Sequence, residues 1–244
     1  MDHTTALLEH NARLVDLAAT ADPERAVPTC PGWTVRQLFT HIGRGDRWAA
    51  EIVRSGGLVE MRAVPDGKPG ADVGGWLAAS PRLLLDAVAD DPEKPVWTFL
   101  GPRPAAWWVR RRLHESTVHW ADGVLASGAH PVLEPPVAAD GVSEWLDLLA
   151  ARAPGPDAAL DPGVVLHLHA TDEGLGSDGE WIVTGTDDGA LRWEHGHGKG
   201  AAAVRGTASD LLLAVLRRIP VDHPGVEVLG DAAVFDRWRE RTAF

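Results

Sequence analysis

The chain has 244 residues, 45% hydrophobic and 24% charged, which is the composition of a globular protein long enough to bury a core of its own. Its formal net charge of -12 argues against a nucleic-acid partner, because phosphate binding depends on clustered Lys and Arg. A single cysteine, Cys30, excludes an intramolecular disulfide and any metal site that needs two cysteines of one chain.

The start of the chain does not resemble a signal peptide. Its first residues carry acidic side chains and a helical apolar pattern, whereas a signal peptide has a basic segment followed by an apolar one. No stretch approaches the roughly 20 consecutive apolar residues of a membrane span. We therefore expect a cytoplasmic protein without a membrane partner, and we take a monomer as the default oligomeric state.

The first predicted helix covers residues 4–20, because apolar side chains recur there at helical spacing. A second helix is predicted over residues 35–55. Thr34 and Gln37 have the spacing of a capping box at its start, and Gly56 is the residue type that commonly ends a helix.

Two longer helices follow, at residues 72–90 and 105–126, with an irregular connection at 91–104 between them. Pro81 lies inside the earlier of the two, so we expect either a kink or a later start of that helix. A short helix at residues 142–151 is expected to close this half of the chain.

The hydrophobic period changes after a segment rich in Pro and Gly at residues 153–156, which we interpret as a linker. Beyond it, alternating apolar side chains and Asp-Gly turns predict strands at residues 163–171, 180–185 and 190–196.

The chain then returns to helical spacing. Helices are predicted at residues 208–218 and 231–241, with a short strand at 226–229 between them. We therefore predict two domains, an all-helical bundle at residues 1–153 and a small α+β domain at 154–244.

The segment from His114 to Asp122 carries side chains typical of a metal site. Glu115 and His119 are four residues apart, so they lie on one face of the helix, close enough to hold one cation. Two ligands rarely suffice for zinc, and His41 is the best third candidate because it lies beside the buried stripe of the second helix. Three protein ligands plus water form a catalytic zinc site. From spacing alone, a hydrogen-bonded or solvated His and Glu pair is the commoner arrangement.

Other chemically active side chains are expected to have simpler roles. His167 and His169 share one face of a predicted strand, where we expect them to be solvated or to line a cleft. His195 and His197 could bind metal as a His-x-His pair, but their flanking glycines favour an exposed loop. Cys30 precedes a Pro-Gly turn and has no sequence partner that would lower its pKa, so packing is expected of it.

Three segments, in the order PTCPGWTVRQLFTHIGRGDRW, RRLHESTVHWADG and VVLHLHATDEG, resemble the mycothiol-dependent maleylpyruvate isomerase family. The resemblance covers nearly the whole chain. It implies a DinB-like, metal-binding four-helix bundle at the N-terminus. It also implies a small α+β C-terminal domain, similar to sterol carrier protein, that helps to form the active-site cleft.

The resemblance implies a zinc ion, or another divalent metal, held by His41, Glu115 and His119. The aspartate that follows the family's last ligand by three residues falls on Asp122, which would accept the free ring N–H of a ligand histidine and set its tautomer. The position directly after the last ligand, often Arg in the family, is Trp120 here, so a substrate contact through that Arg is not carried over.

An arginine of the C-terminal domain matters for activity in the family. Arg218 lies where the family often has a Gly-Arg pair, but Arg217 precedes it here, and two solvated arginines at a helix end are the alternative. The basic run at residues 110–112 is expected to be a solvated face, although one of these arginines could meet an anionic substrate.

The implied function is that of a zinc-dependent enzyme that binds the low-molecular-weight thiol mycothiol as a thiolate for attack on an electrophilic small molecule. Addition to a double bond followed by elimination would make it a maleylpyruvate isomerase-like cis-trans isomerase, and a stable adduct would make it a thiol S-transferase. One alternative is a non-catalytic metal-binding protein whose C-terminal domain carries a small apolar ligand. Another is a metal-dependent hydrolase with Asp122 or His114 as general base.

Overall fold

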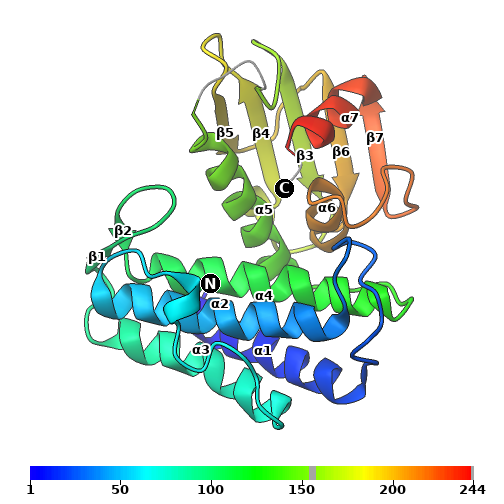
Figure 1. The fold of residues 1–244 in the computed structure, drawn as a ribbon. Helices are drawn as coiled ribbons and strands as arrows, with labels where there is room; N and C mark the ends of the chain where they lie inside the picture. Colours follow the sequence, from blue (N-terminus) through cyan, green and yellow to red (C-terminus); the bar gives the residue numbers. More distant parts are fainter. Residues whose placement is uncertain (154–157, 243–244) are drawn as a thin grey trace. The chain divides into compact units, whose positions relative to one another are not determined.

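A computed structural model describes residues 1–153 and 158–242 of the protein. The chain forms two compact units, Met1–Pro131 and Val132–Phe244 (Figure 1). None of the described helices combines the length and the apolar character that crossing a lipid bilayer requires.

The first unit consists mainly of long helices that run side by side (Figure 1). Its described elements are α1 (His3–Thr20), α2 (Val35–Ser55), η1 (Met61–Ala63), α3 (Val73–Ala89), β1 (Pro95–Val96), β2 (Arg103–Pro104) and α4 (Trp107–Ala126). Helix α2 packs against α3 and α4, and α1 packs against the same two helices. Strands β1 and β2 form a small antiparallel pair in the segment that the sequence predicted as irregular.

The predicted ends of α2 are confirmed, and both have a local cause. The side chain of Thr34 accepts from the backbone N–H of Gln37, while the side chain of Gln37 accepts from the backbone N–H of Thr34. This capping box satisfies two N–H groups that the helix itself leaves unpaired. At the other end, Gly56 takes the left-handed conformation, with φ of 77°, that a residue without Cβ adopts at little cost.

Helix α3 begins at Val73 and continues through Pro81, which excludes the later start, one of the two expected alternatives. The helix begins at Val73 because the side chain of Asp72 accepts a hydrogen bond from the N–H of Gly75. Proline removes one N–H from the helix, and Ser80 places its hydroxyl 2.7 Å from the carbonyl oxygen of Trp76 on the preceding turn.

The core of the first unit determines how α2 is rotated about its axis. Leu14 of α1, Leu38 and Ile42 of α2, and Leu77 of α3 are fully buried in one cluster. Each such side chain contributes about 1.5–3 kcal/mol through burial. His41 precedes Ile42 and so lies about 100° around the helix from it. The buried stripe therefore turns His41 to the edge of α2, outside the core.

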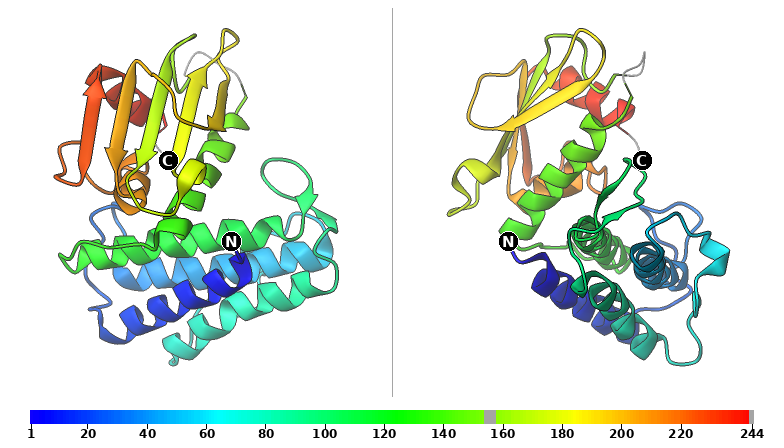
Figure 2. Two further views of the ribbon diagram at one scale, coloured as in Figure 1. Left: turned by 180° about the vertical axis from the view of Figure 1, so that it is seen from behind. Right: turned by 90° about the vertical axis from the view of Figure 1, so that its left-hand side faces the viewer.

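The second unit contains a mixed sheet with helices on one of its faces (Figure 2). Among the described residues, five strands pair in the order β5-β4-β3-β6-β7, with β3 and β6 parallel and the other neighbours antiparallel. The elements are α5 (Pro135–Ala150), β3 (Val165–Ala170), η2 (Gly176–Gly179), β4 (Glu180–Gly185), β5 (Leu191–His195), β6 (Ala202–Gly206), α6 (Ala208–Val215), β7 (Val226–Gly230) and α7 (Ala232–Arg241). Together the two units give the mixed helical and sheet fold that the sequence predicted in outline.

Three details differ from the prediction. Helix α5 begins at Pro135, seven residues early, because Pro is well suited to the first helical turn. It packs against α6 and β5, so the units divide between residues 131 and 132, whereas the sequence placed the boundary at 153 and 154. Strand β6 was not predicted. The predicted linker at 153–156 falls, from residue 154 on, outside the described residues.

The contact between Gly43 and Trp76 provides a test of this packing. A Cβ at Gly43 would overlap the indole ring, whose Nε1 donates to the carbonyl oxygen of Asp66 at 2.7 Å and whose face lies 5.1 Å from the guanidinium of Arg47. Because the ring is held on both sides, Gly43→Ala should lower the free energy of unfolding by about 1–3 kcal/mol in urea denaturation. A Cβ at Gly57 meets nothing within 4 Å, so Gly57→Ala is the matched control. Equal stability of the two variants would contradict the packing.

Candidate metal centre

The first unit contains a cavity of about 590 Å³ that is bordered mainly by α2 and α4. Aromatic side chains and arginines share its wall. Those that matter below are Trp33, Arg36, His41, Arg44, Trp48, Arg111, Arg112 and Glu115. The cavity is thus positively charged at its wall although the whole chain carries a charge of -12.

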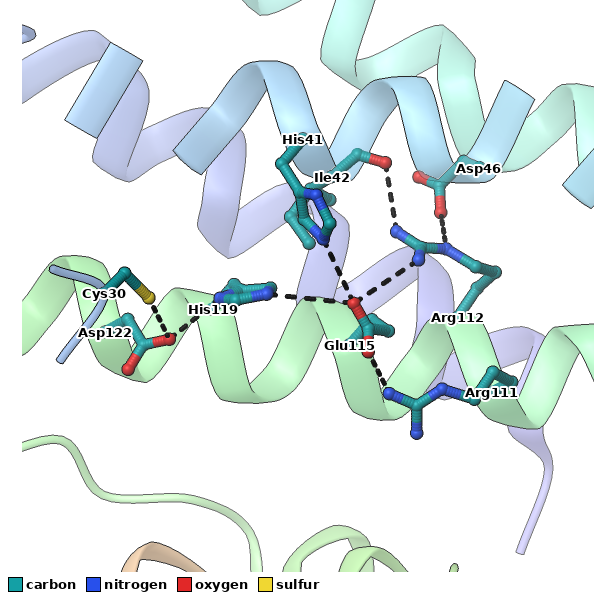
Figure 3. Close-up of polar contacts among 9 residues, drawn as sticks. All are labelled: Cys30, His41, Ile42, Asp46, Arg111, Arg112, Glu115, His119 and Asp122. Carbon is teal, nitrogen blue, oxygen red and sulfur yellow. Dashed lines mark hydrogen bonds and ion pairs between the residues drawn. The ribbon is translucent and has the colours of Figure 1, made fainter. Parts of the chain in front are cut away.

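His41, Glu115 and His119 converge beside this cavity (Figure 3). The Oε2 atom of Glu115 lies 3.3 Å from Nε2 of His41 and 3.7 Å from Nε2 of His119. One donor atom from each residue lies within 4.8 Å of the other two. Glu115 and His119 are one helical turn apart on α4, and His41 faces them from α2. The three side chains that the sequence singled out therefore meet at one point.

Asp122 orients the ring of His119 (Figure 3). Its Oδ2 lies 2.8 Å from Nδ1 of His119, and its Oδ1 accepts a hydrogen bond of 2.6 Å from the hydroxyl of Thr29. Asp122 is fully buried, and a carboxylate only accepts hydrogen bonds, so Nδ1 of His119 carries the proton. The lone pair of Nε2 is then directed toward Glu115 and His41, the orientation that a metal ligand requires.

Cys30, His119 and Asp122 form an alternative group of possible metal ligands, which has His119 in common with the first group. In it, the thiol of Cys30 lies 3.5 Å from Oδ2 of Asp122. The nitrogen of His119 that faces Asp122 in this group is Nδ1. That nitrogen is already engaged by Asp122, whose other oxygen is engaged by Thr29. The arrangement of hydrogen bonds therefore favours the group of His41, Glu115 and His119.

Two arginines surround the carboxylate of Glu115. Arg111 pairs with Oε1, and Nη1 of Arg112 lies 3.6 Å from Oε2. Burial opposes ionisation of Glu115, but these arginines and the bond from His41 outweigh it and hold its pKa well below the ordinary value. Arg112 is itself anchored, because its guanidinium donates to Asp46 at 2.8 Å and to the carbonyl oxygen of Ile42 at 3.0 Å.

The neighbourhood of His41 favours its neutral form. Burial lowers its pKa, and the nearby His119 and Arg112 lower it further, while the hydrogen bond with Glu115 opposes them. The indole of Trp33 lies 5.0 Å from the ring of His41 and 6.1 Å from that of His119, measured between centroids. A neutral imidazole beside an ionised carboxylate is the protonation state that binds a divalent cation.

Other predicted residues lie elsewhere. Arg218 belongs to the second unit, where its Nη1 donates to the carbonyl oxygen of Leu216 at 2.8 Å, and its part in the chemistry stays a prediction. Trp120 packs against the core of the first unit, and the guanidinium of Arg13 lies 5.5 Å from its ring centroid. The side chain of Trp120 therefore does not reproduce the substrate contact that the family's arginine makes from this position.

The expectation of a solvated face at residues 110–112 is wrong for Arg111 and Arg112, whose side chains are 13% and 6% exposed. Their spacing of four and three residues from Glu115 could have indicated the pairing. Thr29 was missed because it is 93 residues from Asp122 in the chain, a separation at which no local pattern operates.

The fold and this cluster define a two-unit protein with a His and Glu centre on its paired helices, and comparison with known proteins identifies the family. Residues 4–122 match the mycothiol maleylpyruvate isomerase N-terminal domain, and residues 136–237 match the C-terminal domain of the same family. The chain therefore belongs to the mycothiol-dependent maleylpyruvate isomerase family.

Solved structures agree with this assignment at the level of the fold. A histidine-to-alanine mutant of the mycothiol-dependent maleylpyruvate isomerase aligns with a TM-score of 0.57 at 15% identity, covering 93% of this chain and 91% of the other. A second structure of the mycothiol-dependent maleylpyruvate isomerase gives 0.52 at 16% identity with the same coverage. No curated protein matches the chain in a sequence comparison.

Asp122→Asn tests the orientation of His119. The amide NH₂ would donate to Nδ1 of His119 and move the ring proton to Nε2, which then faces the cation with no lone pair. Zinc affinity, measured by competition with a chromogenic chelator, should fall about 10- to 100-fold. Cys30→Ser is the companion variant and should stay within about threefold of wild type. A larger loss with Cys30→Ser than with Asp122→Asn would favour the alternative donor group.

Proposed function

We propose that the protein is a zinc-dependent enzyme that activates the thiol of mycothiol for attack on an electrophilic, anionic small molecule. The observation that carries this proposal is the convergence of His41, Glu115 and His119, of which His41 and Glu115 line an arginine-bearing cavity. Membership of the family supports mycothiol as the thiol.

The donor set suits zinc. Two imidazoles and one carboxylate are borderline ligands that zinc accepts, and three protein ligands leave a fourth position for a substrate atom. When bound there, zinc supplies the Lewis acidity that lowers the pKa of a coordinated thiol. The ionised Glu115 has no proton to lose, and the neutral His41 can offer Nε2 to the cation once its ring proton lies on Nδ1.

The cavity wall suits a carboxylic acid as the second substrate. Four arginines border the cavity: Arg36, Arg44, Arg111 and Arg112. Three of them already pair with carboxylates of the chain, so we assign Arg44 to a substrate carboxylate, which a guanidinium can hold through two parallel hydrogen bonds. The same wall offers Trp33, against whose ring a planar unsaturated chain can lie. A maleylpyruvate-type acid combines the two features, an electrophilic double bond and negative charge.

Two outcomes of the thiol attack remain within this proposal. Addition to a double bond, rotation and elimination of the thiol would give a cis-trans isomer, whereas an adduct that does not eliminate would be the product of an S-transferase. The family supports the isomerase outcome. A part for Arg218 in this chemistry, suggested by the family resemblance, belongs to the same proposal.

The hydrolase alternative is weaker because its general base is not available. Asp122 is fully buried and accepts bonds from His119 and Thr29, and His114 is 3% exposed. Neither group lines the described cavity. A general base must come within hydrogen-bond reach of the attacking water, directly or through one further water.

The thiol step is tested by thermal unfolding of the zinc-loaded protein with mycothiol added. Binding to the native state should raise the midpoint, because a ligand stabilises the state that binds it. The shift should disappear after treatment with a chelator. An unchanged midpoint in the zinc-loaded protein would exclude the thiol as a ligand of this site.

His119→Ala tests the ligand assignment. The variant should lose one equivalent of zinc per chain in elemental analysis and lose thiol binding, while its helical circular dichroism stays close to wild type because the core of the unit lies elsewhere. His130→Ala, at an exposed position after α4, is the control and should keep both properties. Full zinc content in His119→Ala would refute the assignment.

A further inference from the structure

A second group of potential metal ligands lies in the second unit and shares no residue with the first. His167, His169, Glu180 and His197 each direct one ligand atom to a common point, and these atoms lie within 4.8 Å of one another. The Oε2 atom of Glu180 is 3.0 Å from Nε2 of His167, 3.1 Å from Nδ1 of His169 and 2.6 Å from Nδ1 of His197.

The register of the sheet brings the first three residues together. His169 on β3 lies directly across from Glu180 at the start of β4, so their side chains share a face. His167 is two residues from His169 and therefore lies on the same face. The side chains of Leu168 and Trp181, on the opposite face, are fully buried. Helices α5, α6 and α7 lie on one side of the sheet, and the left view of Figure 2 shows the other side.

A glycine-rich loop after β5 supplies the fourth residue. Gly196 has φ of 155°, a conformation that side-chain-bearing residues rarely adopt, and its N–H donates to the carbonyl oxygen of Glu180. A Cβ at Gly200 would lie 2.7 Å from the carbonyl oxygen of Val165, so the absence of a side chain lets the loop approach β3. The loop thereby returns His197 to the sheet, where its ring centroid is 5.2 Å from that of His167.

Hydrogen bonding alone explains this geometry poorly. Three imidazole nitrogens point at one oxygen, Oε2 of Glu180, which has two lone pairs. Three donors spread over both oxygens would be the better arrangement for a carboxylate. Convergence of nitrogen and oxygen atoms from four side chains on one point is instead the geometry of ligands around a cation.

We propose that His167, His169, Glu180 and His197 form a second divalent-metal site, with zinc the best-matched ion. Imidazole nitrogens and one carboxylate suit zinc, and four protein ligands complete its tetrahedral shell. No position is left for substrate, so the site is structural. Its effect is to hold the loop at residues 196–201 against β3 and β4.

The exposure of the four side chains fits this role. His167 is 5% exposed and anchors the site at the sheet, whereas His197 is 74% exposed and comes from the loop. Binding would therefore fasten a surface segment to a rigid base. It would also leave the active-site chemistry proposed for the first unit unchanged, since the two groups share no ligand.

The experiment counts zinc per chain in the full-length protein after loading and gel filtration. Wild type should hold two equivalents, His119→Ala one, His197→Ala one, and the double variant none. His197 is on the surface, so its removal does not endanger folding. His195→Ala is the matched control, because the ring of this neighbour bonds to the backbone oxygen of Glu180 and not to its carboxylate, so the variant should keep both equivalents.

The two proposals fail in different ways. Equal zinc content in His119→Ala and in the double variant would overturn the second site and leave the first intact. A loss in His197→Ala with no loss in His119→Ala would overturn the first and support the second.

Proteolysis supplies an independent readout of the loop. Trypsin cleavage after the exposed Lys199, followed by mass spectrometry of the two fragments, should slow at least about fivefold when zinc is added to His119→Ala. Zinc should have no such effect on the double variant lacking His197. Cleavage that is equally fast with and without zinc in His119→Ala would contradict attachment of the loop.

Discussion

The attachment of α4 to α2 through Arg112 underlies the arrangement of the first unit. Its guanidinium reaches Asp46 and the carbonyl oxygen of Ile42 on α2, and it also lies near Glu115 on its own helix. Burial raises the pKa of Asp46, and Arg112 opposes that rise. Loss of one partner from a buried pair costs about 3–5 kcal/mol, so this contact sets the register in which His41 faces Glu115.

The wall of the cavity is positively charged, whereas the chain as a whole is negatively charged. An acidic chain repels anions at long range, and salt screens that effect beyond about 8–10 Å. Inside the cavity, Arg111 and Arg112 act at contact distance and are largely shielded from solvent. The same two arginines keep Glu115 ionised. Their positive charge therefore stabilises the carboxylate of the metal centre and also favours the anionic substrate that we propose.

The fold was predictable wherever its causes are local. The capping box at Thr34 and the glycine at 56 determine both ends of α2 through hydrogen bonds within a few residues. Strand β6 and the unit to which α5 belongs were not predictable in this way. The strand is defined by its parallel pairing with β3, and the unit to which α5 belongs is defined by its packing against α6. Both depend on partners far away in the chain.

The same division holds for the two candidate centres. The sequence alone determined that Glu115 and His119 share a helix face, since the period of the α-helix requires it. Only the tertiary structure decided that His41, 74 residues from Glu115, meets this pair, and that His197 returns to Glu180. Spacing along one helix or strand is a property of the backbone, whereas the meeting of two elements depends on how their buried faces pack, which no short segment of the chain encodes.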